Sequence, residues 1–156
     1  MKSTLALLAM TTALVLPGLA IARPVTVTTT LTNYGGDGAY LALYVTDPAG
    51  AYAGTLWVAG KKSKYYEHMT DWYRVSRGDQ SQINGITGAS VGGGRTLEIT
   101  VDLQDALLDA GYTLHIDAAV EDMRDSPREV SVPLTTQGAG QPVAGRRYIA
   151  NVTYRF

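Results

Sequence analysis

Apolar residues recur with period two along most of this sequence, and that periodicity limits the folds open to it. Five segments alternate apolar residues with threonine or other polar residues: 25–32, 96–102, 113–121, 129–134 and 147–156. Successive side chains of a β-strand point to opposite faces, so each segment is predicted to be a strand with one buried and one solvated face. Such strands are typical of antiparallel sheets.

Two further strands are predicted to form a hairpin. Residues 39–46 are apolar at nearly every position, which indicates a central strand with both faces covered. The turn sequence Asp47-Pro48-Ala49-Gly50 follows, with a proline that fixes φ and a glycine where the chain reverses. The partner strand is expected over about residues 51–58.

One segment, residues 63–77, breaks the period and predicts an amphipathic helix that begins at Ser63 as N-cap. Its stripe has the spacing i, i+4, i+7 and i+8 and consists of Tyr65, Met69, Trp72 and Tyr73. We expect the stripe to pack over one end or edge of the sheets. The alternative is a stacking platform for a sugar or a flavin, formed by Tyr65, Tyr66, Trp72 and Tyr73. A short helical turn is also expected at residues 105–110.

About seven short strands, one amphipathic helix and turn-rich connections predict a mainly β fold, an immunoglobulin-like antiparallel β-sandwich. An eight-stranded closed barrel is the alternative architecture. Residues 23–156 are enough for a single domain whose core needs no metal or disulfide.

The N-terminus has the pattern of a secretory signal peptide. Lys2 precedes an apolar run over residues 5–16, and the segment ends in Ala20-Ile21-Ala22. The run is shorter than the roughly 20 apolar residues that a transmembrane helix needs. We expect cleavage after Ala22, so that residues 1–22 are a signal peptide and residues 23–156 are a periplasmic domain.

Composition excludes several classes of function. The chain has no cysteine, which rules out disulfides, thiolate metal sites and thiol catalysis. The net charge is −1 and the basic residues are not clustered in the sequence, so we expect no nucleic-acid partner. No second apolar span follows the leader, so we expect no membrane insertion of the mature protein.

Metal binding is also not expected. His115 and Asp117 fall on the polar face of their predicted strand, and three carboxylates follow nearby, those of Glu121, Asp122 and Asp125. The spacing matches no metal motif, so a solvated strand face is preferred to a hard-cation site. Glu129 is placed on the polar face of the next strand in the same way.

The most unusual segment is the glycine-rich loop 80–95, QSQINGITGASVGGGR. Loops of this length without secondary structure tend to be functional or disordered. A plain connection is one interpretation. A second is a serine nucleophile, because Gly88-Ala89-Ser90-Val91-Gly92 fits G-x-S-x-G, although Gly93 and Gly94 disfavour the helix that this motif requires. His115 is the only histidine downstream of it.

Flavin attachment is the third interpretation. Thr87-Gly88-Ala89-Ser90 resembles the [S/T]-G-A-[S/T] sequence on which flavin transferases esterify the phosphate of FMN to a hydroxyl. Ser90 is at the acceptor position, and its small neighbours permit close approach. Asn84 stands where an acidic residue is usual, and Gly92 stands where a second hydroxyl is usual.

Several segments together resemble a family of predicted periplasmic proteins, domain of unknown function 2271. They are LALYVTDPAGAYAGTLWVAG, KYYEHMTDWYRVSR, NGITGAS, DAGYTLHIDAAVED and REVSVPL. In that family the third segment tends to read DAVTGAT. The resemblance implies a periplasmic β domain associated with membrane reductase-like partners and flavin transfer, with no established activity.

These observations favour a non-catalytic periplasmic accessory protein. In its specific form it is a covalent FMN carrier, modified at Ser90 by a flavin transferase and working with a membrane reductase. Thr87, Gly88, Ala89 and Asn84 would form the recognition sequence around the acceptor. The alternative is a β-sandwich module that binds a ligand or a partner without redox chemistry.

Overall fold

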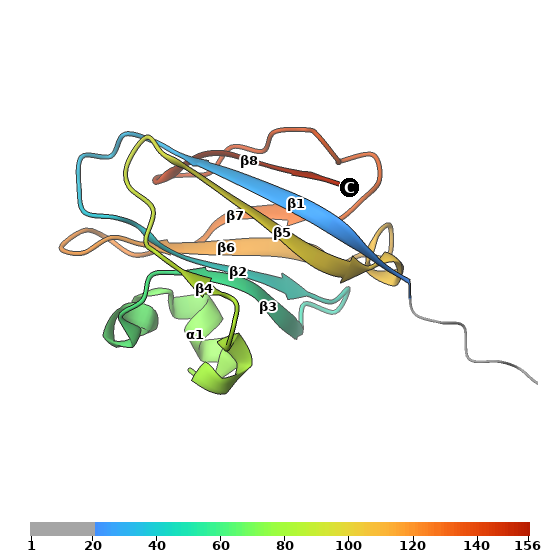
Figure 1. Cartoon of the computed structure of the whole chain (residues 1–156), viewed down its shortest axis with the longest axis horizontal. Coiled ribbons are helices and arrows are strands. Elements are labelled where there is room, and N and C mark those ends of the chain that lie inside the picture. The colour runs from blue at the N-terminus through green and yellow to red at the C-terminus, as the bar shows by residue number, and fades with distance from the viewer. Residues whose placement is uncertain (1–20) are drawn as a thin grey trace, which may run out of the picture.

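Two β-sheets packed face to face form the body of the protein (Figure 1). The computed structural model describes residues 21–156. One sheet has the order β5-β1-β8, with β5 (Thr96–Gln104), β1 (Ala22–Leu31) and β8 (Ile149–Arg155). The other has the order β4-β3-β2-β6-β7, with β4 (Thr87–Gly88), β3 (Tyr52–Ala59), β2 (Tyr40–Thr46), β6 (Thr113–Ala119) and β7 (Ser126–Pro133). The predicted mainly β sandwich with one helix is confirmed, and the described strands form two sheets rather than one closed sheet. The immunoglobulin-like detail stays a prediction.

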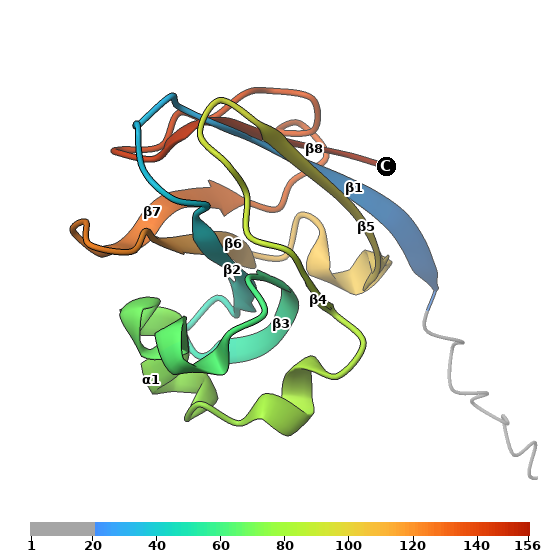
Figure 2. The same ribbon diagram turned by 60° about the vertical axis from the view of Figure 1, so that its left-hand side comes forward.

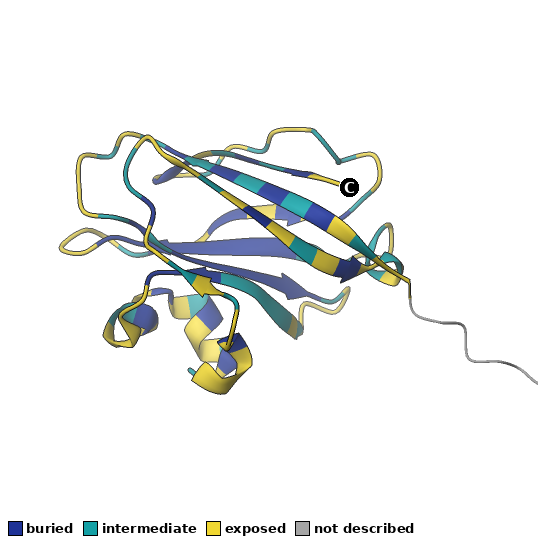
Figure 3. Ribbon diagram, viewed as in Figure 1, coloured by how far each residue is buried: buried dark blue, intermediate teal, exposed yellow. Residues whose placement is uncertain are grey.

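Burial follows the sequence alternation most closely in β1. Val25, Val27 and Leu31 are buried while the threonines between them are partly exposed, except for the buried Thr29 (Figure 3). The buried side chains of β1 face those of the five-stranded sheet, and together they form the main hydrophobic core. From the five-stranded sheet this core takes Leu41, Leu43, Val45, Leu114, Ile116, Ala118, Val130 and Val132.

The predicted hairpin is confirmed as β2 and β3. Asp47 Oδ1 accepts hydrogen bonds from the backbone N–H groups of Ala49 and Ala51, each at 2.9 Å, and Gly50 has a φ of +83°. An Asx-type turn with glycine at positive φ is therefore what reverses the chain. β2 lies between β3 and β6 and is buried on both faces, as expected for a central strand.

The helical segment differs from the single helix predicted over residues 63–77. A 3₁₀ helix, η1 (Ser63–His68), and an α-helix, α1 (Thr70–Ser76), meet at Met69. The change of helix type rotates the buried stripe to Tyr66, Met69 and Trp72, so that Tyr73 is 39% exposed. The Ser63 cap is wrong, because the flanking residue is Lys62 and no side-chain cap bond forms there.

This segment covers a face of the five-stranded sheet, not an end or edge of the sheets. Figure 2 shows α1 on the side of β2 and β3 that is turned away from the three-stranded sheet. Its buried side chains pack against Ala42, Tyr44 and Val58 in a second hydrophobic cluster. The sheet is consequently buried on both faces over most of β2 and β6.

The predicted solvated face of β6 is therefore wrong. His115 is 6% exposed and Asp117 is fully buried, because α1 and a bulge in β7 cover them. The bulge lies where the β6–β7 register shifts, and Arg128 has a φ of +45° there. An extra residue in one strand reorients the neighbouring side chains. Glu129, expected on the polar face, is accordingly buried as well.

Residues 1–20, most of the predicted signal peptide, lie outside the described residues, and cleavage after Ala22 stays a prediction. Arg23 Nε lies 2.5 Å from Asp105 Oδ1, which ties the start of β1 to the end of β5. There the predicted turn at 105–110 is a shorter 3₁₀ helix, η3 (Asp105–Leu107). Among residues 21–156, no helix combines the length and hydropathy that a membrane crossing requires.

Candidate functional site

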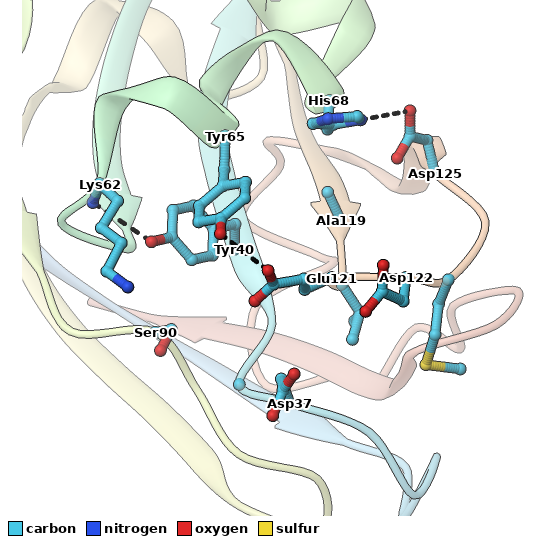
Figure 4. A pocket seen from close by; sticks show the side chains of 13 residues that line it. Asp37, Tyr40, Lys62, Tyr65, His68, Ser90, Ala119, Glu121, Asp122 and Asp125 are labelled. Carbon is cyan, nitrogen blue, oxygen red and sulfur yellow. Dashed lines mark hydrogen bonds and ion pairs between the residues drawn. The ribbon is translucent and has the colours of Figure 1, made fainter.

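A pocket of about 440 Å³ opens at one end of the five-stranded sheet (Figure 4). β2 is antiparallel to β3 and β6, so the start of β2 meets the ends of the other two strands there. β4 runs parallel to β3 and brings its own end to the same place. The lining residues come from the loops at these strand ends and from η1: Asp37, Gly38, Tyr40, Lys62, Tyr65, His68, Ser90 and 119–123 with Asp125.

Two tyrosines form the aromatic part of the wall. The rings of Tyr40 and Tyr65 meet edge to face, with centroids 5.4 Å apart. The Tyr65 hydroxyl donates a hydrogen bond of 2.8 Å to Glu121, and the Lys62 backbone N–H donates one of 3.2 Å to the Tyr40 hydroxyl. Gly60, at a φ of +117°, lies so close to the Tyr40 ring that a Cβ would collide with it. The position of Tyr40 thus depends on that glycine.

The pocket is acidic. Four carboxylates line it, those of Asp37, Glu121, Asp122 and Asp125, against the single ammonium group of Lys62. His68 Nδ1 lies 3.2 Å from Asp125 Oδ2, on the side of the pocket away from Ser90 in Figure 4. The surplus of carboxylates favours a ligand that carries positive charge and opposes one that brings several negative charges.

Ser90 is exposed and lines this pocket. Backbone hydrogen bonds hold the chain on both sides of it. The carbonyl oxygens of Ile86 and Gly88 accept hydrogen bonds from β3 and from Gly60, at 2.9 and 2.8 Å, and Val91 pairs with Ala39. The loop is therefore anchored on both sides of Ser90.

The other four predicted site residues lie outside the pocket lining. Thr87, Ala89 and Asn84 are exposed, and Asn84 follows the 3₁₀ helix η2 (Gln80–Ile83). Gly88 is half-buried against Trp57, where a Cβ would lie 2.8 Å from the indole Cζ2. The glycine of the T-G-A-S sequence thus has a packing role of its own.

Close packing also surrounds the acceptor position. A Cβ on Gly38 would lie 2.5 Å from Ser90 Oγ, so the chain before β2 passes directly beside the Ser90 side chain. Sequence reasoning considered Glu121 only as a possible metal ligand, and it missed Gly38, Tyr40 and Lys62. No local pattern marks them, because they converge only through strand pairing. Tyr65 is predicted to belong to the packing stripe of the helix, yet it lines the pocket beside Tyr40.

The nucleophile arrangement does not form. After Ser90 the chain continues through a glycine turn into β5, with no helix to raise the hydroxyl. His115 is buried, with Nε2 2.8 Å from Thr46 Oγ1 and Nδ1 2.7 Å from Ser131 Oγ. Burial lowers its pKa, and both ring nitrogens already have partners, so it does not serve Ser90 as a base.

The acidic residues that followed His115 in the sequence are divided between two places. Asp117 lies under α1, whereas Glu121, Asp122 and Asp125 line the pocket. Asp117 accepts hydrogen bonds from the Trp72 and Arg128 backbone N–H groups, both at 2.8 Å, and burial raises its pKa. Within residues 21–156, no group of three or more histidines and carboxylates is placed to hold a metal ion.

Comparison with known proteins adds one finding. No curated protein and no solved structure matches the chain. A family model described as "Predicted periplasmic protein (DUF2271)" matches residues 22–151, which include β1 to β7, the start of β8 and the whole pocket. With that much of its length matched, the chain belongs to this family of predicted periplasmic proteins.

Proposed function

We propose that this protein is a covalent FMN carrier of the periplasm, with Ser90 Oγ as the attachment atom. The observation that carries the proposal is the exposure of Ser90 on the wall of a pocket bounded by Tyr40 and Tyr65. A modifying enzyme needs an accessible hydroxyl, and a tethered flavin needs a surface beside it.

The pocket suits a ring system of this size. Its volume of about 440 Å³ is within the range of small-molecule sites. Tyr40 and Tyr65 offer aromatic surface for the ring, while Lys62 offers the only ammonium group in the lining. Attached FMN supplies reversible electron transfer, and the protein's part is to hold the group and to shape its surroundings.

Attachment replaces one phosphate bond with another. The Ser90 Oγ–phosphorus bond forms as the phosphoanhydride bond of a flavin dinucleotide breaks, AMP leaves, and the hydroxyl proton passes to the flavin transferase. The acidic pocket explains why the link would be covalent. Four carboxylates oppose the binding of free FMN with its phosphate dianion, whereas the ester carries one charge fewer and cannot dissociate. A membrane reductase would then exchange electrons with the carrier.

Co-expression with an exported flavin transferase tests the proposal. The wild-type protein should show flavin fluorescence in a denaturing gel, and its mass should rise by that of one FMN less one water. Ser90→Ala should be dark, Ser90→Thr should stay fluorescent, and Ser81→Ala, which removes an exposed serine earlier in the same loop, should be unaffected. A dark wild type overturns the proposal.

A second variant tests the recognition sequence. Asn84→Asp restores the acidic residue usual at that position and should increase the labelled fraction. Asn84 is exposed and its side chain makes no hydrogen bond within the described residues, so the change should not disturb folding. Labelling that falls in this variant would contradict the assignment of Asn84.

The alternative function is a non-redox binding module that uses the same pocket. The observation that favours it is the acidic wall beside two tyrosine rings, which suits an organic cation. In that case Tyr65→Ala and Glu121→Gln should each weaken binding of a quaternary ammonium probe, and Ser90→Ala should not.

A further inference from the structure

A second pocket, of about 320 Å³, lies on the other side of the β6–β7 connection. It is bounded by the start of β7 and by the chain that enters β8, which are edge strands of different sheets. Its lining consists of Arg124, Asp125, Ser126, Pro127, Arg146 and Arg147. The pocket therefore sits at one open side of the sandwich.

Positive charge dominates this pocket. The lining contains three arginines and one carboxylate, that of Asp125, which is also hydrogen-bonded to His68. Arg124 and Arg147 are exposed, and among residues 21–156 none of the three arginines forms an ion pair. Three positive charges against one negative charge leave an excess of positive charge in the lining, and this excess favours an anion that neutralises it.

A buried carboxylate holds both walls of the pocket in place. Glu129 is 1% exposed, and its Oε1 accepts hydrogen bonds from four successive backbone N–H groups, those of residues 146–149. Its Oε2 accepts a hydrogen bond from the Ser126 hydroxyl on the opposite wall. Gly145 permits the tight approach, because a Cβ there would lie 2.5 Å from the Ile149 carbonyl oxygen.

Glu129 thereby fixes the backbone that carries Arg146 and Arg147, and both residues line the pocket. The Arg146 guanidinium donates a further hydrogen bond to the Pro127 carbonyl oxygen, which ties it across the pocket. One arginine is thus oriented by the protein itself, and the guanidinium groups of the other two form no hydrogen bond with residues 21–156. Pre-orientation of donors reduces the entropy lost when a ligand binds.

We propose that this pocket is a binding site for a phosphate group. Guanidinium groups donate paired, charge-assisted hydrogen bonds to phosphate oxygens. Three arginines from two walls match a tetrahedral dianion better than a planar carboxylate, which carries a single charge and presents only two oxygens. The ligand is inorganic phosphate or the monoester of a small molecule, which share this chemistry.

Isothermal titration calorimetry with inorganic phosphate, at constant ionic strength, tests the site. Glycerol 3-phosphate serves as the monoester probe, and acetate as the planar, singly charged probe. We expect saturable binding of the phosphate probes, with acetate at least about tenfold weaker. The phosphate probe that binds more tightly shows whether the site prefers inorganic phosphate or a monoester.

Variants locate the binding. Arg147→Gln should weaken phosphate binding about tenfold, and Arg124→Gln with Arg147→Gln should abolish it. Arg155→Gln, an exposed arginine at the far end of β8, is the matched control and should bind as the wild type does. Ser90→Ala should also retain phosphate binding, so the result stands apart from the flavin proposal.

Two results would overturn the site. One is a response to phosphate that does not saturate and that sodium chloride reproduces. The other is equal weakening by Arg155→Gln and Arg147→Gln, which would mean that net charge alone attracts the anion. All four variants change exposed side chains, so a loss of folding does not obscure either outcome.

Discussion

The two faces of the five-stranded sheet are both buried, but by different chemistry. The inner face, toward the three-stranded sheet, is aliphatic and includes Leu43 and Ile116. The outer face, under α1, carries Tyr44, His115 and Asp117, each of them buried. The same strands supply both sets, since adjacent residues point to opposite sides.

The difference reflects what covers each face. On the inner face, aliphatic side chains of the two sheets pack against each other, so apolar burial is sufficient there. A short helix covers the outer face, and its first backbone N–H groups need acceptors. Asp117 provides one, by accepting from the Trp72 N–H in the first turn of α1. The outer face is thus held by hydrogen bonds that the inner face does not need.

The largest effect should come from removing that acceptor. Asp117→Ala leaves the Tyr44 hydroxyl and the backbone N–H groups of Trp72 and Arg128 without their partner, and should lower the free energy of unfolding by about 4 kcal/mol. Chemical denaturation measures this. Asp117→Asn keeps an acceptor oxygen and should lose clearly less. Equal losses in the two variants would mean that charge, not acceptance, matters there.

Next in size is truncation of the inner face. Leu43→Ala should cost about 3 kcal/mol, through lost apolar burial and the cavity left behind. The amide exchange of α1 should not be selectively accelerated, because Leu43 faces away from it. Selective opening of α1 in this variant would show that the two faces are not independent.

Titration of the outer face gives a smaller, pH-dependent effect. Burial lowers the pKa of His115 below its usual 6.5, so the unfolded chain binds this proton more readily. The stability that neutral His115 contributes is present above pH 6.5 and falls as the pH drops below that value. From pH 8 to pH 5, the wild type should therefore lose more unfolding free energy than His115→Gln. Parallel curves for the two proteins would refute this.

Asp117 acts in the opposite direction. Burial raises its pKa above the usual 3.8, so its contribution is complete below that pH and is lost as the pH rises through the folded value. The unfolding free energy of Asp117→Asn relative to the wild type should therefore rise with pH above 3.8. A relative stability that falls with pH would contradict the raised pKa.

The smallest effect concerns the anchor between α1 and the sheet. Thr55 Oγ1 accepts a 2.9 Å hydrogen bond from the Trp72 indole and is 2.6 Å from the Tyr52 hydroxyl. Thr55→Val keeps the shape and removes both contacts, and should cost about 1 kcal/mol. The fluorescence of Trp72 should shift as its N–H loses the partner. Thr28→Val, at a partly exposed threonine on β1, is the control and should cost almost nothing.

Local chemistry explains which predictions succeeded. The β2–β3 hairpin and its turn follow from Asp47 and Gly50, which act within a few residues. The helix between residues 63 and 77 was found from its spacing, but its stripe was misplaced. A switch from 3₁₀ to α geometry at Met69 changes which side chains point inward, and the apolar pattern alone does not reveal such a switch.

The pocket around Ser90 could not be predicted either, because it too depends on geometry that the local pattern does not reveal. Tyr40, Tyr65 and Glu121 are far apart in the sequence and meet only because the start of β2 lies beside the ends of β3 and β6. The motif around Ser90 was visible as a string of small residues. Its anchoring against β3 and Ala39 was not, since those bonds join distant parts of the chain.

The sequence by itself determined every strand except the short β4, as well as the central position of β2 and the turn that follows it, because period two and turn chemistry are local properties. Tertiary structure alone decided that His115, Asp117 and Glu129 are buried, and that Ser90 lines a pocket. A polar residue in an alternating strand faces water unless something covers it. Here a helix and a bulge cover it, and both depend on contacts between segments that no local pattern encodes.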